Sequence, residues 1–261
     1  MQDVRLLIQK IIAIGGGEIG RSKEGGGFYP IETTLIDKEI IKISNFKKPK
    51  LLFLPTASSD SSGYVSVVEN YFGKKLGCFV DSLLLKKQKY SRNEIEKKIL
   101  SSDIIYVGGG NTLKMLMIWK KFGVDKILEK ARSKGIVLSG VSAGAICWAK
   151  LGNSDSRKFK NPKADYIKLK CLNFLPVLLC PHYDKEKSRP LSLKKMMKKT
   201  SGVAIALDNC AALEVVNDKV RLITSNSTAK GYKIFWSRGK YCKEVLIKNK
   251  WILISDLIKK N

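Results

Sequence analysis

The stretch IVLSGVSAGAICWAK, residues 136–150, decides the fold. It begins as an apolar, β-branched run, turns at Gly-x-Ser-x-Gly and continues as a helix-like segment. This strand-turn-helix order is the context of a nucleophile elbow, in which glycines allow a tight turn that exposes a serine. It marks Ser142 as a candidate nucleophile. A β-to-α turn that only needs small residues is the alternative, and it stays open.

Other short apolar runs flank this stretch and end in Gly, Asn or Asp, as parallel strands buried on both faces do. We expect strands at 11–15, 51–55, 79–84, 103–107, 136–141, 177–181, 203–207, 211–216, 220–224, 232–236 and 244–254. Helical periodicity covers 64–76, 92–100, 112–133 and 190–200. The alternation predicts an α/β protein with a doubly wound, mostly parallel sheet, helices on both faces and extra strands at the carboxyl end. Because no linker or composition break interrupts it, residues 1–261 are expected to form a single domain.

The composition argues against disorder and against a membrane protein. Of the 261 residues, 44% are hydrophobic, which is more than a disordered chain carries. No apolar run approaches the roughly 18 to 20 residues of a membrane span, and the amino terminus lacks the apolar stretch of a secretion signal. We therefore expect a cytoplasmic protein without a membrane partner.

Charge and cysteine usage limit the partners. The 49 Lys and Arg exceed the 23 Asp and Glu, which leaves a net charge of +26. Lys-Lys pairs recur throughout the chain, so we expect a solvated basic shell and no specific nucleic-acid partner. The six cysteines lack CxxC spacing and there is one histidine. We expect reduced thiols, no metal site and no cofactor.

The one imidazole, His182, follows the run PVLLC at the end of the strand expected after the elbow helix. Ligands of open parallel sheets bind at the carboxyl ends of the strands, so His182 is the candidate general base for Ser142. A structural histidine with satisfied hydrogen bonds is the alternative.

A third side chain should orient the imidazole. The sequence offers four candidates, which are Asp155, Asp184, Asp208 and Asn209. Neighbouring strand residues point to opposite faces, so only one of the last two is expected to reach His182.

Two glycine runs also follow predicted strands. GGGNT, residues 108–112, opens a helix, and its N–H groups can form half of an oxyanion hole opposite Ala143. A glycine turn without a ligand role explains this run equally well. GGGEIG, residues 15–20, matches G-x-G-x-x-G, but a glycine-rich loop follows instead of the helix that must receive a pyrophosphate. We expect no dinucleotide site there.

The motifs VGGGNT, GVSAGAICW, CPHYD and LDNCAAL occur in an order and spacing that resembles the peptidase E family of serine peptidases, which includes aspartyl dipeptidase and cyanophycinase. The resemblance runs from IIAIGGG to about residue 216. It implies a flavodoxin-like sheet similar to that of class I glutamine amidotransferases. It also implies Ser142 as nucleophile, His182 as general base, and oxyanion donors from Gly110 and Ala143.

The family's substrates are peptides with an amino-terminal Asp, or Asp-rich polymers, so an acidic small peptide is the expected partner. We expect Arg189 to clamp the substrate carboxylate, although a solvated arginine before a helix is an equal alternative. Asn111 is a second expected substrate contact.

Two positions depart from the family's pattern. Asn209 stands where the family's orienting group is similar to a glutamate, and Lys150 stands where close relatives look acidic. An amide can fix the imidazole tautomer, but it cannot stabilise an imidazolium as a carboxylate does. The departures predict reduced activity, or a substitute acid at Asp208 or Asp155.

We expect a serine-type, dipeptidase-like enzyme that hydrolyses small peptides through an acyl-enzyme. An α/β-hydrolase esterase is one alternative, which the 40 positions between Ser142 and His182 disfavour. A non-catalytic or impaired amidotransferase-like binding domain is another, which Asn209 and Lys150 favour. A homodimer stays open as the oligomeric state.

Overall fold

The buried apolar runs form the parallel centre of an eight-stranded sheet in the computed structural model, which describes residues 9–260. Strands β3, β2, β4, β5 and β1 are parallel neighbours in that order, and β10, β11 and β14 continue the sheet antiparallel. The bounds are β1 (Lys10–Ile14), β2 (Lys50–Leu54), β3 (Phe79–Ser82), β4 (Ile104–Val107), β5 (Val137–Val141), β10 (Ala211–Val216), β11 (Lys219–Thr224) and β14 (Ile252–Leu253).

The remaining strands form a second sheet, ordered β13-β12-β9-β8-β6-β7, in which β6, β8 and β9 are parallel. The bounds are β6 (Ala149–Ser154), β7 (Ile167–Lys170), β8 (Leu175–Cys180), β9 (Ala204–Leu207), β12 (Gly231–Ser237) and β13 (Lys240–Val245). The two sheets share one apolar core, which includes Ile11 and Leu138 of the first and Leu179 and Ile205 of the second.

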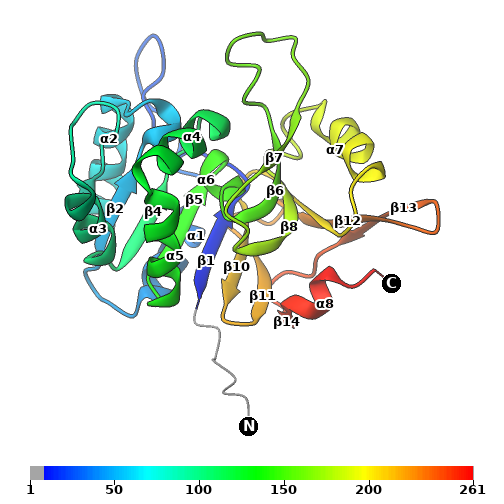
Figure 1. The fold of residues 1–261 in the computed structure, drawn as a ribbon. Helices are drawn as coiled ribbons and strands as arrows, with labels where there is room; N and C mark the ends of the chain where they lie inside the picture. The colour runs from blue at the N-terminus through cyan, green and yellow to red at the C-terminus, as the bar shows by residue number, and fades with distance from the viewer. Residues whose placement is uncertain (1–8, 261) are drawn as a thin grey trace.

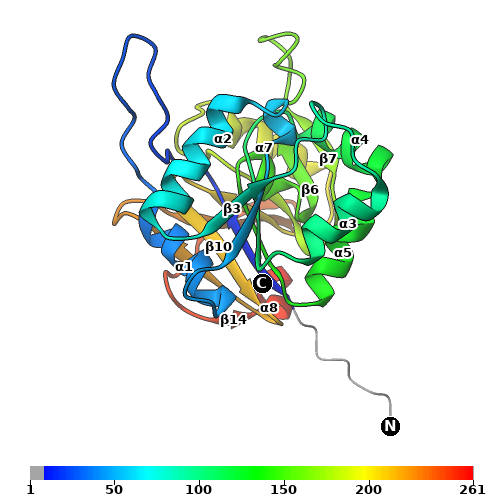
Figure 2. The same cartoon turned by 90° about the vertical axis from the view of Figure 1, so that its left-hand side faces the viewer.

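Helices cover both faces of the first sheet, as the alternation predicted (Figures 1 and 2). Figure 2 shows α1 and α2 on one side of the sheet and α3 and α5 on the other. Successive strand residues alternate between two cores, so that Ile11 packs with the α5 side and Ile12 with the α1 side. The bounds are α1 (Thr34–Ser44), η1 (Thr56–Ser58), α2 (Ser62–Val68), η2 (Glu69–Lys75), α3 (Arg92–Leu100), α4 (Thr112–Phe122), α5 (Val124–Ser133), α6 (Ala143–Ile146), α7 (Arg189–Lys198) and α8 (Ile254–Ile258).

Several predicted elements differ from the observed ones. The long helix expected at 112–133 is two helices, because Gly123 adopts a left-handed φ of 71° between α4 and α5. Helix α1 and strands β6 and β7 were not predicted. The β-rich segment expected at 244–254 is largely a connection between β13 and the short β14. Among residues 9–260, no helix has the length and hydropathy needed to cross a membrane.

Asp37 of helix α1 is a buried carboxyl group with an unusual pKa. Its side chain is fully buried and accepts hydrogen bonds from the hydroxyls of Thr33, at 2.7 Å, and Tyr71, at 2.9 Å. Burial outweighs these bonds and raises the pKa of Asp37 to about 7. The unfolded chain releases this proton near pH 4, so the stability that Asp37 contributes is fully present below about pH 4. It decreases as the pH rises toward 7 and is constant above that.

We therefore expect Asp37→Asn to stabilise the protein at pH 8 and to lose this advantage near pH 4. The amide can still accept both hydrogen bonds but carries no charge to bury. The gain has an upper limit of about 4 kcal/mol, since about three pKa units separate the folded and unfolded carboxyl. Thermal unfolding at pH 4 and pH 8 measures it, with the exposed Glu129→Gln as control. A lower melting temperature at pH 8 contradicts the prediction.

Candidate active site

Ser142 lies in a strained turn between β5 and α6. Its φ of 57° and ψ of −109° are unusual for a residue with a side chain. A Cβ on Gly140 would lie 2.6 Å, and one on Gly144 2.1 Å, from the carbonyl oxygen of Val107 at the end of β4. The two glycines of the motif therefore allow β4 to pass close beside the elbow, which holds Ser142 at the carboxyl edge of the sheet.

His182 follows β8 and reaches Ser142 from the second sheet. Its Nε2 lies 2.9 Å from Ser142 Oγ, and its Nδ1 lies 2.7 Å from Asn209 Oδ1. Because an amide oxygen only accepts hydrogen bonds, the consistent tautomer carries its proton on Nδ1. Nε2 is then free to accept the hydroxyl proton of Ser142.

The structure brings Asn209, and not Asp208 or Asp155, to the imidazole. Asp208 is buried, accepts the backbone N–H of Lys230 at 2.9 Å, and has a pKa that burial raises. Asp155 lies 3.9 Å from the guanidinium of Arg189. Neither carboxylate contacts the imidazole in place of the glutamate that the family's pattern has at position 209.

Asp184, the fourth candidate, acts on Asn209 instead of on His182. Its Oδ1 accepts the backbone N–H of Asn209 at 2.8 Å. This bond fixes the main chain that carries the amide.

The end of β1 and the glycine run that follows it bind the backbone of the three segments that form the site. The sequence analysis did not predict this role. The carbonyl oxygens of Ile14, Gly15 and Gly16 accept the N–H groups of Ser142, His182 and Cys210, at 3.0, 3.0 and 2.8 Å. Three successive peptides of one strand end thus position all three segments of the site.

Gly16 leaves no room for a side chain. A Cβ there would lie 2.1 Å from Asn209 Oδ1 and 2.4 Å from His182 Nδ1. The missing side chain permits the hydrogen bond between the amide and the imidazole. The next helix, α1, begins only at Thr34, so the run does not open a helix as a dinucleotide site requires.

The two expected oxyanion donors are Ala143, which directly follows Ser142, and Gly110, which follows β4. Gly110 has a φ of 135°, and a Cβ there would lie 2.4 Å from the carbonyl oxygen of Ala57, so only glycine fits. Gly109 is close to Ser142, since a Cβ on Gly109 would lie 3.5 Å from the Cβ of Ser142. Among residues 9–260, no hydrogen bond uses the N–H of Gly110 or Ala143. Both N–H groups are available for a ligand oxygen.

Asn111, expected to contact substrate, uses both ends of its side chain within the protein. Its Oδ1 accepts the N–H of Lys114 and caps α4, while its Nδ2 donates to the carbonyl of Ser156, both at 3.0 Å. Asn is a common N-cap because its short side chain reaches these N–H groups. The structure thus corrects our expectation for Asn111, which has a structural role.

Arg189, expected as the substrate clamp, is fully buried. Its guanidinium donates to the carbonyl of Asn153 at 2.7 Å and to Glu186 at 3.0 Å, and it lies 4.8 Å from the ring centre of Tyr166. The expectation for Arg189 is corrected, because the guanidinium is buried and pairs with these internal groups instead of facing the cavity at Ser142. Pattern reading could not reveal its burial, which depends on the distant strand β6.

The second departure, Lys150, lies on an exposed position of β6. It borders a lysine-rich hollow with Lys168, Lys170 and Lys199, apart from the residues that line the cavity at Ser142. The departure at Lys150 therefore does not alter that cavity.

A cavity of about 490 Å³ adjoins Ser142 and His182. The loop after β1 and the start of α2 form its walls, and this loop projects beyond the sheet in both views (Figures 1 and 2). The lining side chains outside the predicted site are Glu18, Ile19, Arg21, Ser22, Ser61, Tyr64, Val67 and Val141. The position of Glu18, Ile19, Arg21 and Ser22 in the sequence could have indicated their place in the cavity. They lie in the loop after a parallel strand, and such loops border the ligand crevice.

Tyr64 of α2 is a further site residue that the sequence analysis missed. Its hydroxyl oxygen accepts the N–H of Gly109 at 3.4 Å. Burial raises the pKa of Tyr64 to about 12, so the phenol stays protonated at neutral pH. It can donate a hydrogen bond into the cavity.

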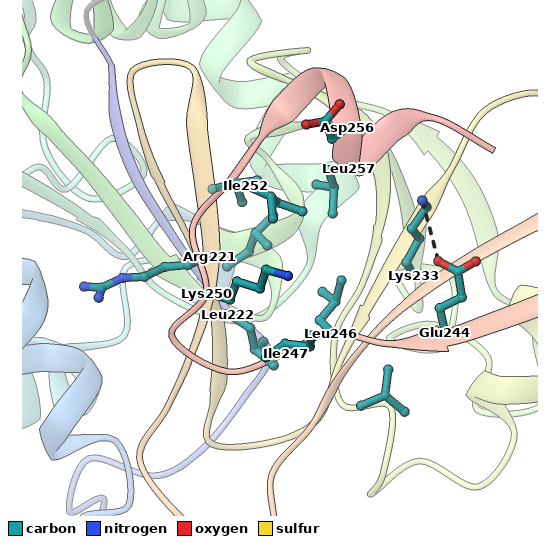
Figure 3. A pocket seen from close by; sticks show the side chains of 13 residues that line it. Arg221, Leu222, Lys233, Glu244, Leu246, Ile247, Lys250, Ile252, Asp256 and Leu257 are labelled. Carbon is teal, nitrogen blue, oxygen red and sulfur yellow. Dashed lines mark ion pairs between the residues drawn. The ribbon is translucent and has the colours of Figure 1, made fainter. Parts of the chain in front are cut away.

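Figure 3 shows a second cavity, of about 350 Å³, that contains none of the predicted site residues. Strands β11, β12 and β13 and the carboxyl-terminal segment enclose it, and Lys233 pairs with Glu244 at 3.6 Å on its wall. Within the described part of the chain, no three His, Cys, Asp or Glu side chains cluster in a manner suited to a metal ion.

Solved structures resemble this fold at low sequence identity. A peptidase from an acI-B1 Actinobacterium matches with a TM-score of 0.71 and 18% identity, over 95% of this chain and 98% of that one. A candidate peptidase E protein from Listeria monocytogenes EGD-e matches with a TM-score of 0.59 and 21% identity, over 82% and 98%. These likenesses show a shared fold, in agreement with the predicted class.

Similarity in sequence identifies the family to which this chain belongs. An uncharacterized peptidase of Bacillus subtilis (strain 168), YgaJ, is 38% identical over 229 residues, which cover 87% of this chain and 92% of the relative. The uncharacterized peptidase Lmo0363 of Listeria monocytogenes is 31% identical over 161 residues, which cover 58% and 74%. The model of "Peptidase family S51" matches residues 24–223. The chain therefore belongs to peptidase family S51, as its resemblance to the peptidase E family predicted.

Proposed function

We propose that this protein is a serine peptidase that hydrolyses small peptides through an acyl-enzyme. The observation that carries the proposal is the hydrogen-bonded series from Ser142 Oγ through His182 to Asn209 Oδ1, at 2.9 and 2.7 Å. The free N–H groups beside the elbow and the membership of family S51 support the same chemistry.

The site suits the two halves of an acyl transfer. Ser142 Oγ attacks the scissile carbonyl carbon while its proton passes to His182 Nε2, and the N–H groups of Ala143 and Gly110 bind the oxyanion. The imidazolium then gives that proton to the leaving amine as the C–N bond breaks. Nε2 next takes a proton from water as the water oxygen attacks the acyl ester. It returns that proton to Ser142 Oγ as the ester C–O bond breaks and the acid leaves.

The cavity supports a small substrate with at least one charged group. Its volume of about 490 Å³ suits a dipeptide better than a folded chain. Arg21, and not Arg189, is the arginine on its wall. An amino-terminal Asp, the preference of the family, therefore has a basic partner within the cavity.

Covalent labelling and a substrate panel test the proposal. We expect wild-type protein to react with a fluorophosphonate at Ser142, which peptide mass mapping identifies. We also expect it to hydrolyse dipeptides and amino-acyl p-nitroanilides from a panel with amino-terminal Asp, Glu, Ala, Leu and Arg. Hydrolysis of a short aryl ester but of no peptide would favour the esterase. An unreactive Ser142 would favour the binding domain.

Asn209→Asp is expected to raise kcat/KM at neutral pH by about tenfold or more. A carboxylate in place of the amide stabilises the imidazolium that forms during attack, which a neutral amide oxygen cannot do to the same extent. Initial rates from pH 5 to 9 measure the effect, with Asn209→Ala as a reference that orients nothing. Activity that falls in Asn209→Asp as far as in Asn209→Ala would show that the amide itself is required.

A further inference from the structure

The loop between β1 and α1 is an ordered hairpin at the mouth of the cavity. Isolated β-bridges join Ile19 to Ile31 and Ser22 to Phe28, and the backbone N–H of Glu32 donates to the carbonyl of Glu18 at 2.7 Å. These bonds hold the base of the hairpin in place, and its tip projects away from the sheet (Figure 2).

Glu18 and Arg21 form an ion pair on the wall that the hairpin gives to the cavity. Arg21 Nη2 lies 2.8 Å from Glu18 Oε1, and the side chains are 61% and 30% exposed. The guanidinium also lies 4.6 Å from the ring centre of Tyr29. The pair is therefore oriented by its neighbours and remains open to a ligand.

This pair shares a cavity with Ser142. Glu18 and Arg21 line the same cavity as Tyr64, Ser142 and His182. The phenol is bonded to Gly109, which lies against Ser142. A peptide whose carbonyl carbon lies at Ser142 can thus extend its amino-terminal group toward Glu18.

The carboxylate of Glu18 has hydrogen-bonding capacity left. A carboxylate offers about four lone-pair sites, and Arg21 uses one site at 2.8 Å and a second at 3.4 Å. An ammonium group is the complementary ligand. Glu32 adds a second negative side chain at the same place, since its Oε2 accepts the N–H of Glu18 at 3.0 Å.

We propose that Glu18 binds the free α-ammonium group of the substrate and makes the enzyme selective for peptides with an unblocked amino terminus. Arg21 orients Glu18 and meets a carboxylate on the substrate side chain. The inference rests on the proposed peptidase function and adds the residue that reads the substrate terminus.

The test compares two substrates that share one scissile bond, a free aspartyl p-nitroanilide and its N-acetylated form. We expect Glu18→Gln to raise KM for the free amine by about 10- to 100-fold, the range of a hydrogen bond to a charged group, with little change in kcat. The N-acetylated substrate is expected to react equally with both proteins. Glu24→Gln, at an exposed position of the same hairpin, is the matched control and should behave as wild type.

Fluorophosphonate labelling distinguishes an error in the role of Glu18 from an error in the proposed peptidase function. If Ser142 labels equally in wild type and Glu18→Gln, but the variant keeps the wild-type preference for the free amine, the role of Glu18 is wrong and the peptidase stands. A loss that is equal for both substrates would also overturn it, because it would indicate a structural role. If wild type neither labels nor cleaves any peptide, the proposed function falls, and the role of Glu18 falls with it.

Discussion

Ser142→Ala is expected to lower peptide hydrolysis by about four orders of magnitude or more, the scale on which loss of a serine nucleophile reduces kcat. The variant keeps the elbow, the imidazole and the oxyanion donors, but the acyl-enzyme cannot form. KM should change little, because the hydroxyl contributes little to substrate binding. Steady-state kinetics with the best substrate of the panel measures both constants.

Two observations make this result interpretable. The exposed Ser133→Ala on α5 is a matched control that should keep full activity. Circular dichroism should show the same fold in Ser142→Ala, since the removed hydroxyl is bonded only to His182 among the described residues. Residual hydrolysis within tenfold of wild type would contradict the acyl-enzyme mechanism, and labelling that persists in the variant would identify another nucleophile.

Gly16→Ala is expected to lower kcat by about 10²- to 10⁴-fold, between the loss of a misplaced group and the loss of a triad member. The new methyl group would lie 2.1 Å from Asn209 Oδ1 and 2.4 Å from His182 Nδ1, so at least one of the two side chains must move. The backbone of Gly16 is outside the left-handed region, so alanine is permitted there except for these contacts. The cost in stability is expected to be about 1 to 3 kcal/mol, as for an overpacked core.

The control for Gly16→Ala is Gly73→Ala. A Cβ at Gly73 meets its nearest neighbour at an ordinary 3.5 Å, so activity should be unchanged. The rate of fluorophosphonate labelling should fall in Gly16→Ala together with kcat, because both depend on the base. A variant with wild-type turnover would show that the contact between His182 and Asn209 is dispensable.

Local patterns made the meeting of Ser142 and His182 predictable. Each follows a short apolar run, and parallel strands bring their carboxyl ends to one edge of a sheet. The glycines of the elbow carried the signal for the turn, since only small residues permit the approach of Val107. A sequence pattern contains this information because it depends on neighbours along the chain.

Strand periodicity did not decide between Asp208 and Asn209, although the family resemblance implied position 209. The two residues are adjacent, and hydrogen bonds to distant parts of the chain fix the backbone that orients them. The N–H of Asn209 donates to Asp184 Oδ1, and the N–H of Cys210 donates to the carbonyl of Gly16. Helix α1 was missed for a related reason, since the glycine-rich hairpin before it hid where the helix begins.

Chain order and residue periodicity therefore decided the fold class and the position of Ser142 at a strand end, because strand and turn preferences act over a few neighbouring residues. The family followed from the motifs and their order. The tertiary structure decided the partner of the imidazole, the burial of Arg189 and the charged wall formed by Glu18 and Arg21. These features depend on which strand ends and loops meet in space. Such contacts join residues far apart in the chain, and no local spacing records them.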